Sequence, residues 1–128
     1  MPLELRLLAY SAILTWLMIV TASLVRSGGS LAIAFGNRDD VPPPTPVGGR
    51  ADRAAKNMLE NLALFTAVTL AAGAGGSAHH DRVVLGARIF FWARVAYWPV
   101  YLAGIKYLRT ALWFASILGM AVMLSAVL

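Results

Sequence analysis

Long apolar stretches separated by short polar segments make up most of this chain. Residues 7–25 and 110–128 contain no charged side chain at all. A helix needs about 20 predominantly apolar residues to cross the hydrocarbon core of a bilayer. Both stretches are therefore predicted to be transmembrane helices.

Two further apolar stretches complete a predicted bundle of four helices in one domain covering residues 1–128. The segment GNRDDVPPPTPVGG, which follows the first helix, is expected to break any helix because of its Pro and Gly content. Short connections between the later helices imply an all-α, up-down antiparallel arrangement. The predicted spans cover about residues 5–25, 51–74, 83–104 and 107–128.

Composition agrees with a membrane protein and excludes several other classes. Hydrophobic residues make up 59% of the chain and charged residues only 13%, and the mean hydropathy is +0.70. A soluble domain of this size is far less apolar. The chain has no cysteine, so disulfides, protein thiolate nucleophiles and iron–sulfur sites are excluded. The net charge of +5 does not indicate nucleic-acid binding, because the basic residues are distributed among the membrane segments and do not form one soluble patch.

The basic residues instead predict how the helices are oriented. Lys and Arg are enriched on the cytoplasmic side of membrane proteins. One predicted side collects Arg26, Arg38, Arg50, Arg53, Lys56, Lys106 and Arg109, whereas the other collects Arg6, Arg82 and Arg88. We therefore expect the Pro-rich loop and the turn at Lys106 to be cytoplasmic, with both termini outside.

A ladder of polar side chains enters the second predicted span. Arg50, Arg53, Asn57 and Glu60 recur at intervals that place them on one face of a helix, and Asn61 lies at the edge of that face. These four residues and Asn61 are unexpected in an apolar segment, because charged groups inside a membrane are rare and usually functional.

The third predicted span carries a matching polar face. Arg94, Tyr97 and Tyr101 are spaced to share one side of the helix. Glu60 and Arg94 are both predicted to lie roughly 10–15 Å deep, counted at 1.5 Å per residue. An ionised group at that depth costs on the order of 3 kcal/mol or more. We therefore expect Glu60 and Arg94 to form a buried pair inside the bundle.

Structural interpretations of the same residues remain open. The Glu60–Arg94 pair can serve only to fix helix register, and the three basic residues from Arg50 to Lys56 can serve as headgroup anchors. The aromatic residues can form an interfacial belt; they are Tyr97, Trp98, Tyr101, Tyr107 and Trp113. His79 and His80 lie in a Gly-rich segment, where a solvated turn is favoured over a metal site.

The polar residues together suit a small anionic ligand. Arg side chains bind carboxylates in a bidentate manner. The groups at Asn57 and Glu60 can bind an ammonium or a peptide group. Arg109, at the predicted start of the fourth span, can hold a thiol as thiolate, because a nearby cation lowers a thiol pKa from about 8.5.

Three segments resemble the MAPEG superfamily, the membrane-associated proteins in eicosanoid and glutathione metabolism. RAAKNMLEN is similar to its second-helix signature, which assigns Arg53, Asn57 and Glu60, with Arg50 as the preceding Arg. ARVAYWPVYLAG resembles its third-helix pattern, and RTALW resembles the segment that opens its fourth helix. These assign Arg94, Tyr97 and Tyr101 in the third helix, and Arg109 in the fourth as the thiolate-stabilising residue.

The resemblance implies a homotrimer of four-helix subunits in a membrane, with a bacterial inner membrane as the expected location. It implies glutathione bound in a U shape between neighbouring subunits near the cytoplasmic side, with Arg26 as a ligand for one of its carboxylates. A small lipophilic electrophile is the implied second substrate of a transferase, peroxidase or isomerase. The chain departs from the prostaglandin synthase branch at Tyr97, at Trp113 and in one residue inserted at the Lys106 turn.

Two other classes of function are weighed against this one. A non-catalytic scaffold or accessory subunit of the same fold would keep the motifs, since they indicate ligand binding and not turnover. A small four-helix multidrug exporter would be similar in length but relies on a Glu embedded in its first helix. Here the first span has only Glu4, at its very end, which disfavours the exporter.

Overall fold

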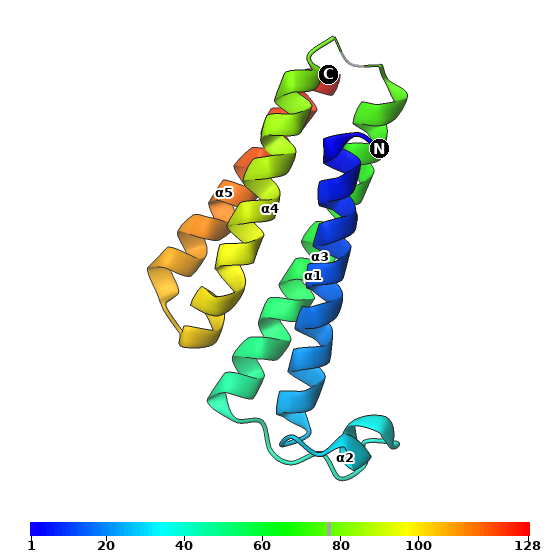
Figure 1. The fold of residues 1–128 in the computed structure, drawn as a ribbon. Helices are drawn as coiled ribbons and strands as arrows, with labels where there is room; N and C mark the ends of the chain where they lie inside the picture. The colour runs from blue at the N-terminus through cyan, green and yellow to red at the C-terminus, as the bar shows by residue number, and fades with distance from the viewer. Residues whose placement is uncertain (77) are drawn as a thin grey trace.

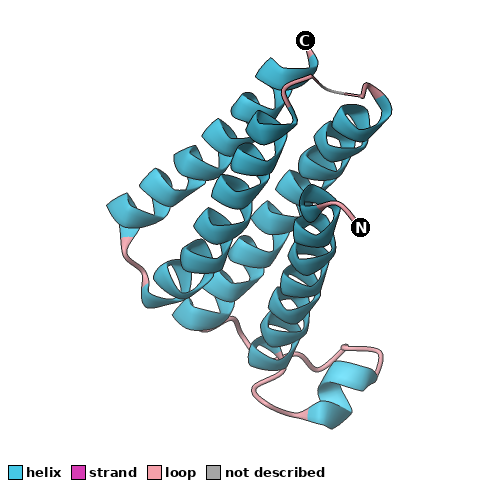
Figure 2. Cartoon of the chain, turned by 45° about the horizontal axis from the view of Figure 1, so that its top comes forward, coloured by secondary structure: helices cyan, strands magenta, loops and turns pink. Residues whose placement is uncertain are grey.

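The computed structural model describes residues 1–76 and 78–128, and these fold into helices joined by short loops (Figure 2). The long helices α1, α3, α4 and α5 run alternately in opposite directions, so both termini lie at the same end of the bundle (Figure 1). The predicted up-down antiparallel arrangement is therefore present in the single chain. The helices are α1 (Leu3–Arg26), α2 (Leu31–Phe35), α3 (Pro46–Ala74), α4 (His80–Ala103) and α5 (Lys106–Val127).

The segment between the first two predicted spans contains more helix than expected. The short helix α2 precedes the Pro-rich loop, and α3 begins at Pro46, inside the segment expected to break helices. The Thr45 side chain accepts a hydrogen bond from the backbone N–H of Gly48 at 3.0 Å. A Thr cap followed by Pro at the first position is a favourable helix start, because Pro loses no hydrogen bond there. The expectation that this segment contains no helix is thus wrong for its last four residues, 46–49.

The other predicted boundaries differ from the observed ones by a few residues. α1 extends beyond the prediction at both ends, α4 begins three residues earlier, and α5 begins one residue earlier. α4 also continues through Pro99. The predicted turn GAGGSAHHD contains residue 77, which lies outside the described residues.

The bundle is built from two closely packed helix pairs, α1 with α3 and α4 with α5 (Figure 1). α4 and α5 approach most closely where Gly86 faces Gly119. A Cβ atom added at Gly86 would collide with the carbonyl oxygen of Gly119, and one added at Gly119 would lie 2.6 Å from the oxygen of Gly86. Backbone contact at this crossing therefore requires glycine on both helices.

Most of the interior is apolar and aromatic, and the buried hydroxyl groups of α1 are satisfied locally. Phe65 of α3 stacks on Phe90 of α4 with ring centroids 4.0 Å apart. Buried Ser11 and Thr15 donate to carbonyl oxygens one turn earlier in α1, at 2.8 and 2.7 Å. These bonds remove the cost of burying unpaired hydroxyls.

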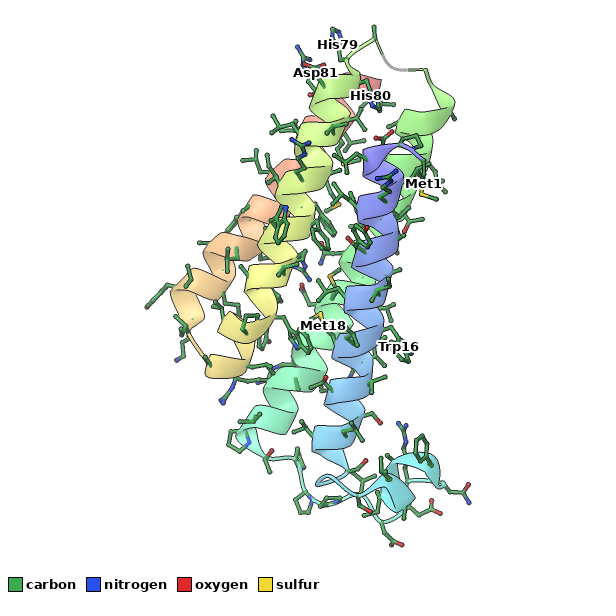
Figure 3. The ribbon with its side chains drawn as sticks, in the orientation of Figure 1. Met1, Trp16, Met18, His79, His80 and Asp81 are labelled. Atoms are coloured by element: carbon green, nitrogen blue, oxygen red, sulfur yellow. The ribbon has the colours of Figure 1, made fainter. Side chains whose placement is uncertain are left out.

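The outer surface is also apolar, as expected for helices that contact lipid. Trp16 points away from the bundle and is 64% exposed, whereas Met18, two residues further along α1, points inward and is fully buried (Figure 3). Of the described helices, α1, α4 and α5 are long and apolar enough to cross a membrane. α3 is not among them because the polar ladder lowers its hydropathy, so its crossing stays a prediction.

Candidate functional site

Arg94 lies at the centre of the polar groups that join α3 to α4. Its side chain is fully buried, and its Nη2 atom donates a hydrogen bond of 2.7 Å to Oδ1 of Asn57. Its Nε atom lies 3.2 Å from the sulfur of Met58, and its Cζ atom lies 4.3 Å from the centroid of the Tyr97 ring. The cation is thus held by an amide, a thioether and an aromatic face.

The predicted Glu60–Arg94 pair is wrong for the single chain. Glu60 is exposed, and among the described residues its carboxylate forms no ion pair with Arg94. Glu60 follows Asn57 by three residues, which rotates its side chain about 60° around the helix axis, since each residue turns about 100°. Asn57 consequently faces α4 while Glu60 points out of the bundle. The amide, and not the carboxylate, meets Arg94.

Asn61 completes this contact from one turn further along α3. Its Nδ2 atom donates to the backbone oxygen of Asn57 at 2.8 Å and to Asn57 Oδ1 at 3.3 Å. Asn61 is buried. The sequence placed Asn61 at the edge of the polar face. In the structure its side chain turns inward, toward the Asn57 amide.

Two further Arg side chains of α3 reach the C-terminal end of α4. Arg50 Nε donates to the backbone oxygen of Leu102 at 3.0 Å, and Arg53 Nε donates to the Tyr101 hydroxyl at 3.3 Å. Cations are favoured at a helix C-terminus, where the last carbonyl groups lack partners within the helix. The sequence predicted the shared face of these residues but not their attachment to α4.

Arg109 joins the site from the first turn of α5. Its Cζ atom lies 4.7 Å from the centroid of the Tyr101 ring. That ring meets Tyr97 edge-to-face, with centroids 5.4 Å apart. The two tyrosines thus link the guanidinium groups of Arg94 and Arg109. The sequence predicted that the tyrosines share a face with Arg94, but it did not predict this link to Arg109.

A pocket of about 250 Å³ opens among these groups, with Arg109 in its wall. Arg109, Thr110 and Trp113 belong to one turn of α5, where side chains four apart share a face. Thr110 was not predicted as a site residue, although its position directly after Arg109 is the signal that could have found it. The lining residues are Asn57, Tyr97, Tyr101, Arg109, Thr110 and Trp113.

Arg26 does not join this pocket. It lines a second pocket of about 350 Å³, between the C-terminal half of α1, the loop after it and the opposite side of α3. Arg38, Asp52 and Lys56 line the same pocket. The sequence treated Arg38 as a topology signal and Lys56 as a topology signal or a headgroup anchor. Within one chain, Arg26 is therefore separate from the other predicted ligands.

The histidines lie at the opposite end of the bundle from these pockets, at the start of α4 (Figure 3). Nε2 of His80 lies 3.7 Å from Oε2 of the buried Glu4. Among the described residues, no group of three or more His, Asp or Glu side chains is placed to hold a metal ion.

The family model described as the MAPEG family matches residues 6–128, which is essentially the entire chain. Among curated proteins, no match is found. The family comprises membrane proteins related to glutathione and eicosanoid metabolism. With its apolar helices and its match over almost the full length, this chain is an integral membrane protein that belongs to the MAPEG family.

Proposed function

We propose that this protein is a membrane-embedded glutathione-dependent transferase that acts on a lipophilic electrophile. The observation that carries the proposal is the pocket in which Arg109 lies against Tyr101 and beside Asn57 and Tyr97. A cation, an amide and hydroxyl groups suit a tripeptide that has two carboxylates, two peptide groups and a thiol. Peroxidase or isomerase chemistry would use the same thiolate.

The residues of the proposed site would bind different groups of glutathione, according to their positions. Arg50 and Arg53, at the entry of α3, would bind carboxylates, because guanidinium groups pair with them bidentately. Asn57, Tyr97 and Tyr101 would orient the peptide. Glu60 would reach the ammonium group of the ligand, for which an exposed carboxylate is suited.

Arg109 would stabilise the sulfur as thiolate by placing a positive charge beside it. Bound glutathione would supply the nucleophile, whose sulfur forms a bond to carbon while a leaving group such as halide departs with its electron pair. The thiol proton passes to solvent before this step. The pocket lies at the end of the bundle that carries the Lys106 turn, which we propose faces the cytoplasm, where glutathione is abundant.

The proposed assembly is a homotrimer whose sites lie between subunits. Arg53 and Glu60 are exposed on α3 of the single chain, and α3 is proposed to cross the membrane. Leaving each charge in lipid would cost on the order of 3 kcal/mol. A second copy placed against this face would cover both, and would bring its own Arg26 pocket toward the ligand. Closed symmetry is the usual arrangement for such contacts.

The test is to titrate glutathione into the detergent-solubilised protein and then to assay conjugation of a generic aryl halide. Saturable glutathione binding followed by glutathione-dependent loss of the aryl halide is the expected result. Binding without turnover of any electrophile would favour a non-catalytic scaffold or accessory subunit. Absence of binding would refute the proposal.

A further inference from the structure

The short helix α2, with the sequence LAIAF, contains no polar side chain. It lies within residues 27–37, a stretch without charge that is flanked by Arg26 and Arg38. Such a stretch is too short to cross a bilayer, and apolar segments of about 10–14 residues are typical of buried or interfacial elements. The pattern therefore leaves two places for α2, the protein interior or the membrane surface.

The structure excludes the interior for the outer face of α2. Only Ala34 of this helix is buried, whereas Leu31 is 58% and Phe35 84% exposed. These two side chains are four residues apart and therefore share one face of the helix. Among the described helices, α2 packs against α1 alone. So short a helix is marginal in water by itself, and its exposed apolar face is stabilised only by a further apolar environment.

A tight turn places α2 directly beyond the end of α1. Gly28 and Gly29 adopt positive φ angles of 63° and 82°, which glycine tolerates without strain. The turn keeps α2 at the end of the bundle that carries the turn between α4 and α5 (Figures 1 and 2). In the view of Figures 1 and 3, α2 extends toward the side to which the exposed Trp16 points. The outer face of α2 thus continues the apolar outer surface of α1.

Both ends of α2 have their backbone groups paired, as a poorly hydrated environment requires. Ser30 Oγ accepts a hydrogen bond from the backbone N–H of Ile33 at 3.3 Å. Arg38 Nε donates to the backbone oxygen of Ala34 at 3.1 Å. Arg38 has a φ of 62°, a left-handed conformation that is uncommon and costly for a residue other than glycine. This conformation returns the guanidinium to the end of α2, where a cation is favoured.

We propose that α2 binds the lipid surface and lies in the headgroup layer of the bilayer, with Leu31 and Phe35 inserted among the first acyl carbons. A helix at an interface typically buries its apolar face about 5–10 Å into the boundary between headgroups and acyl chains. Arg26 and Arg38, on either side of the uncharged stretch, remain at the level of the phosphates. The contact anchors the loop between α1 and α3 to the membrane, and it is independent of glutathione binding.

The absence of cysteine from the chain allows a direct test with single labels. Leu31→Cys and Phe35→Cys each carry one thiol-linked fluorophore, and Asn37→Cys, in the exposed loop after α2, is the matched control. Leu31 and Phe35 are exposed, so their replacement leaves the packed interior unchanged. Each labelled protein is reconstituted in vesicles of phosphatidylcholine and phosphatidylglycerol. Quenching is measured with iodide in the water and with lipids that carry a nitroxide either near the headgroup or at the end of the acyl chain.

Labels at positions 31 and 35 should be quenched severalfold less by iodide than the label at position 37. They should also be quenched more strongly by the nitroxide near the headgroup than by the nitroxide at the chain end. The label at position 37 shows whether the fluorophore itself draws the loop into lipid, because it carries the same dye.

Two results would overturn the proposal. Iodide quenching at positions 31 and 35 equal to that at position 37 would place α2 in water. Protection from iodide and from both nitroxide lipids would mean that protein, such as a second copy of the chain, covers this face.

Discussion

At the scale of single residues, Arg109 and Tyr101 form the contact on which the proposed chemistry depends. Their separation of 4.7 Å, from guanidinium carbon to ring centroid, is within the range of a cation–π interaction. Tyr101 also accepts a hydrogen bond from Arg53 through its hydroxyl. One ring thus connects the proposed thiolate-stabilising cation with a proposed carboxylate-binding cation.

Arg109→Leu is expected to raise the pKa of bound glutathione thiol and leave affinity largely intact. If the cation lowers that pKa by about two units, it favours the thiolate by roughly 2.7 kcal/mol. Less thiolate should therefore remain at neutral pH in the variant. Ultraviolet absorbance of the thiolate against pH measures this change. Arg88→Leu, an exposed position on α4 outside both pockets, is the control, and identical titrations of the two variants would disprove the role of Arg109.

The two functions of Tyr101 can be separated by substitution. Tyr101→Phe keeps the ring under Arg109 but removes the hydroxyl that accepts from Arg53, so it should weaken glutathione binding by a few-fold and preserve the thiolate. Tyr101→Leu also removes the cation–π contact, worth about 0.5–2 kcal/mol, and should reduce thiolate formation as well. The same absorbance titration measures the thiolate fraction of each variant, and calorimetry measures its glutathione affinity. Equal thiolate fractions in the two variants would argue against the ring contact.

At the scale of helices, the site depends on how α5 is held against α4. Arg109 and Trp113 enter the pocket from the first turns of α5, while the glycine crossing lies further along the same helix. The close approach of Gly86 and Gly119 brings backbone against backbone. A flexible side chain can move to relieve overlap, but a helix backbone cannot do so without shifting the helix.

Gly86→Ala is expected to destabilise the protein by about 1–3 kcal/mol, the usual cost of overpacking a closely packed interior. The control is Gly73→Ala in α3, where an added Cβ would meet no atom within 4 Å. That change should be neutral or stabilising by up to about 1 kcal/mol, because Ala favours helix over Gly. Thermal unfolding in detergent compares the stabilities of the Gly86→Ala and Gly73→Ala proteins. Equal stabilities would show that the crossing tolerates a methyl group.

At the scale of the whole molecule, the polar face of α3 is incompletely covered. Arg94 is fully buried between helices, whereas Glu60 and Arg53 are exposed. The two pockets also lie on different sides of α3, with Arg26 in one and Arg109 in the other. A ligand that contacts both Arg residues therefore needs two copies of the chain.

Native mass measurement of the solubilised protein is expected to give a closed homo-oligomer, specifically a trimer. Mixing subunits tests where the site lies. Arg26→Leu and Arg109→Leu proteins should each have low conjugation activity, whereas co-assembled mixtures should recover some. With random trimer assembly, about one site in four combines the two intact partners. A stable monomer, or no recovery in proven mixed trimers, would contradict a site between subunits.

The sequence by itself determined the order and direction of the long helices and the residues that share a face. Apolar length, turn residues and helical spacing are local properties, so they could be read without knowing which helices touch. The ladder at Arg50, Arg53 and Asn57, and the row at Arg94, Tyr97 and Tyr101, were predicted in this way. Arg109 was placed correctly at the start of the last helix.

Only the tertiary structure decided which polar groups meet. Glu60 and Arg94 were matched by charge and depth, but the rotation of α3 placed Asn57 against Arg94 and left Glu60 outside. Likewise, Arg26 lies on the other side of α3 from Arg109. Depth along a helix follows from counting residues, whereas rotation about its axis is set by packing against neighbours distant in sequence. That packing fixed the contact between Asn57 and Arg94, the lining of the pocket and the separation of Arg26 from the other site residues.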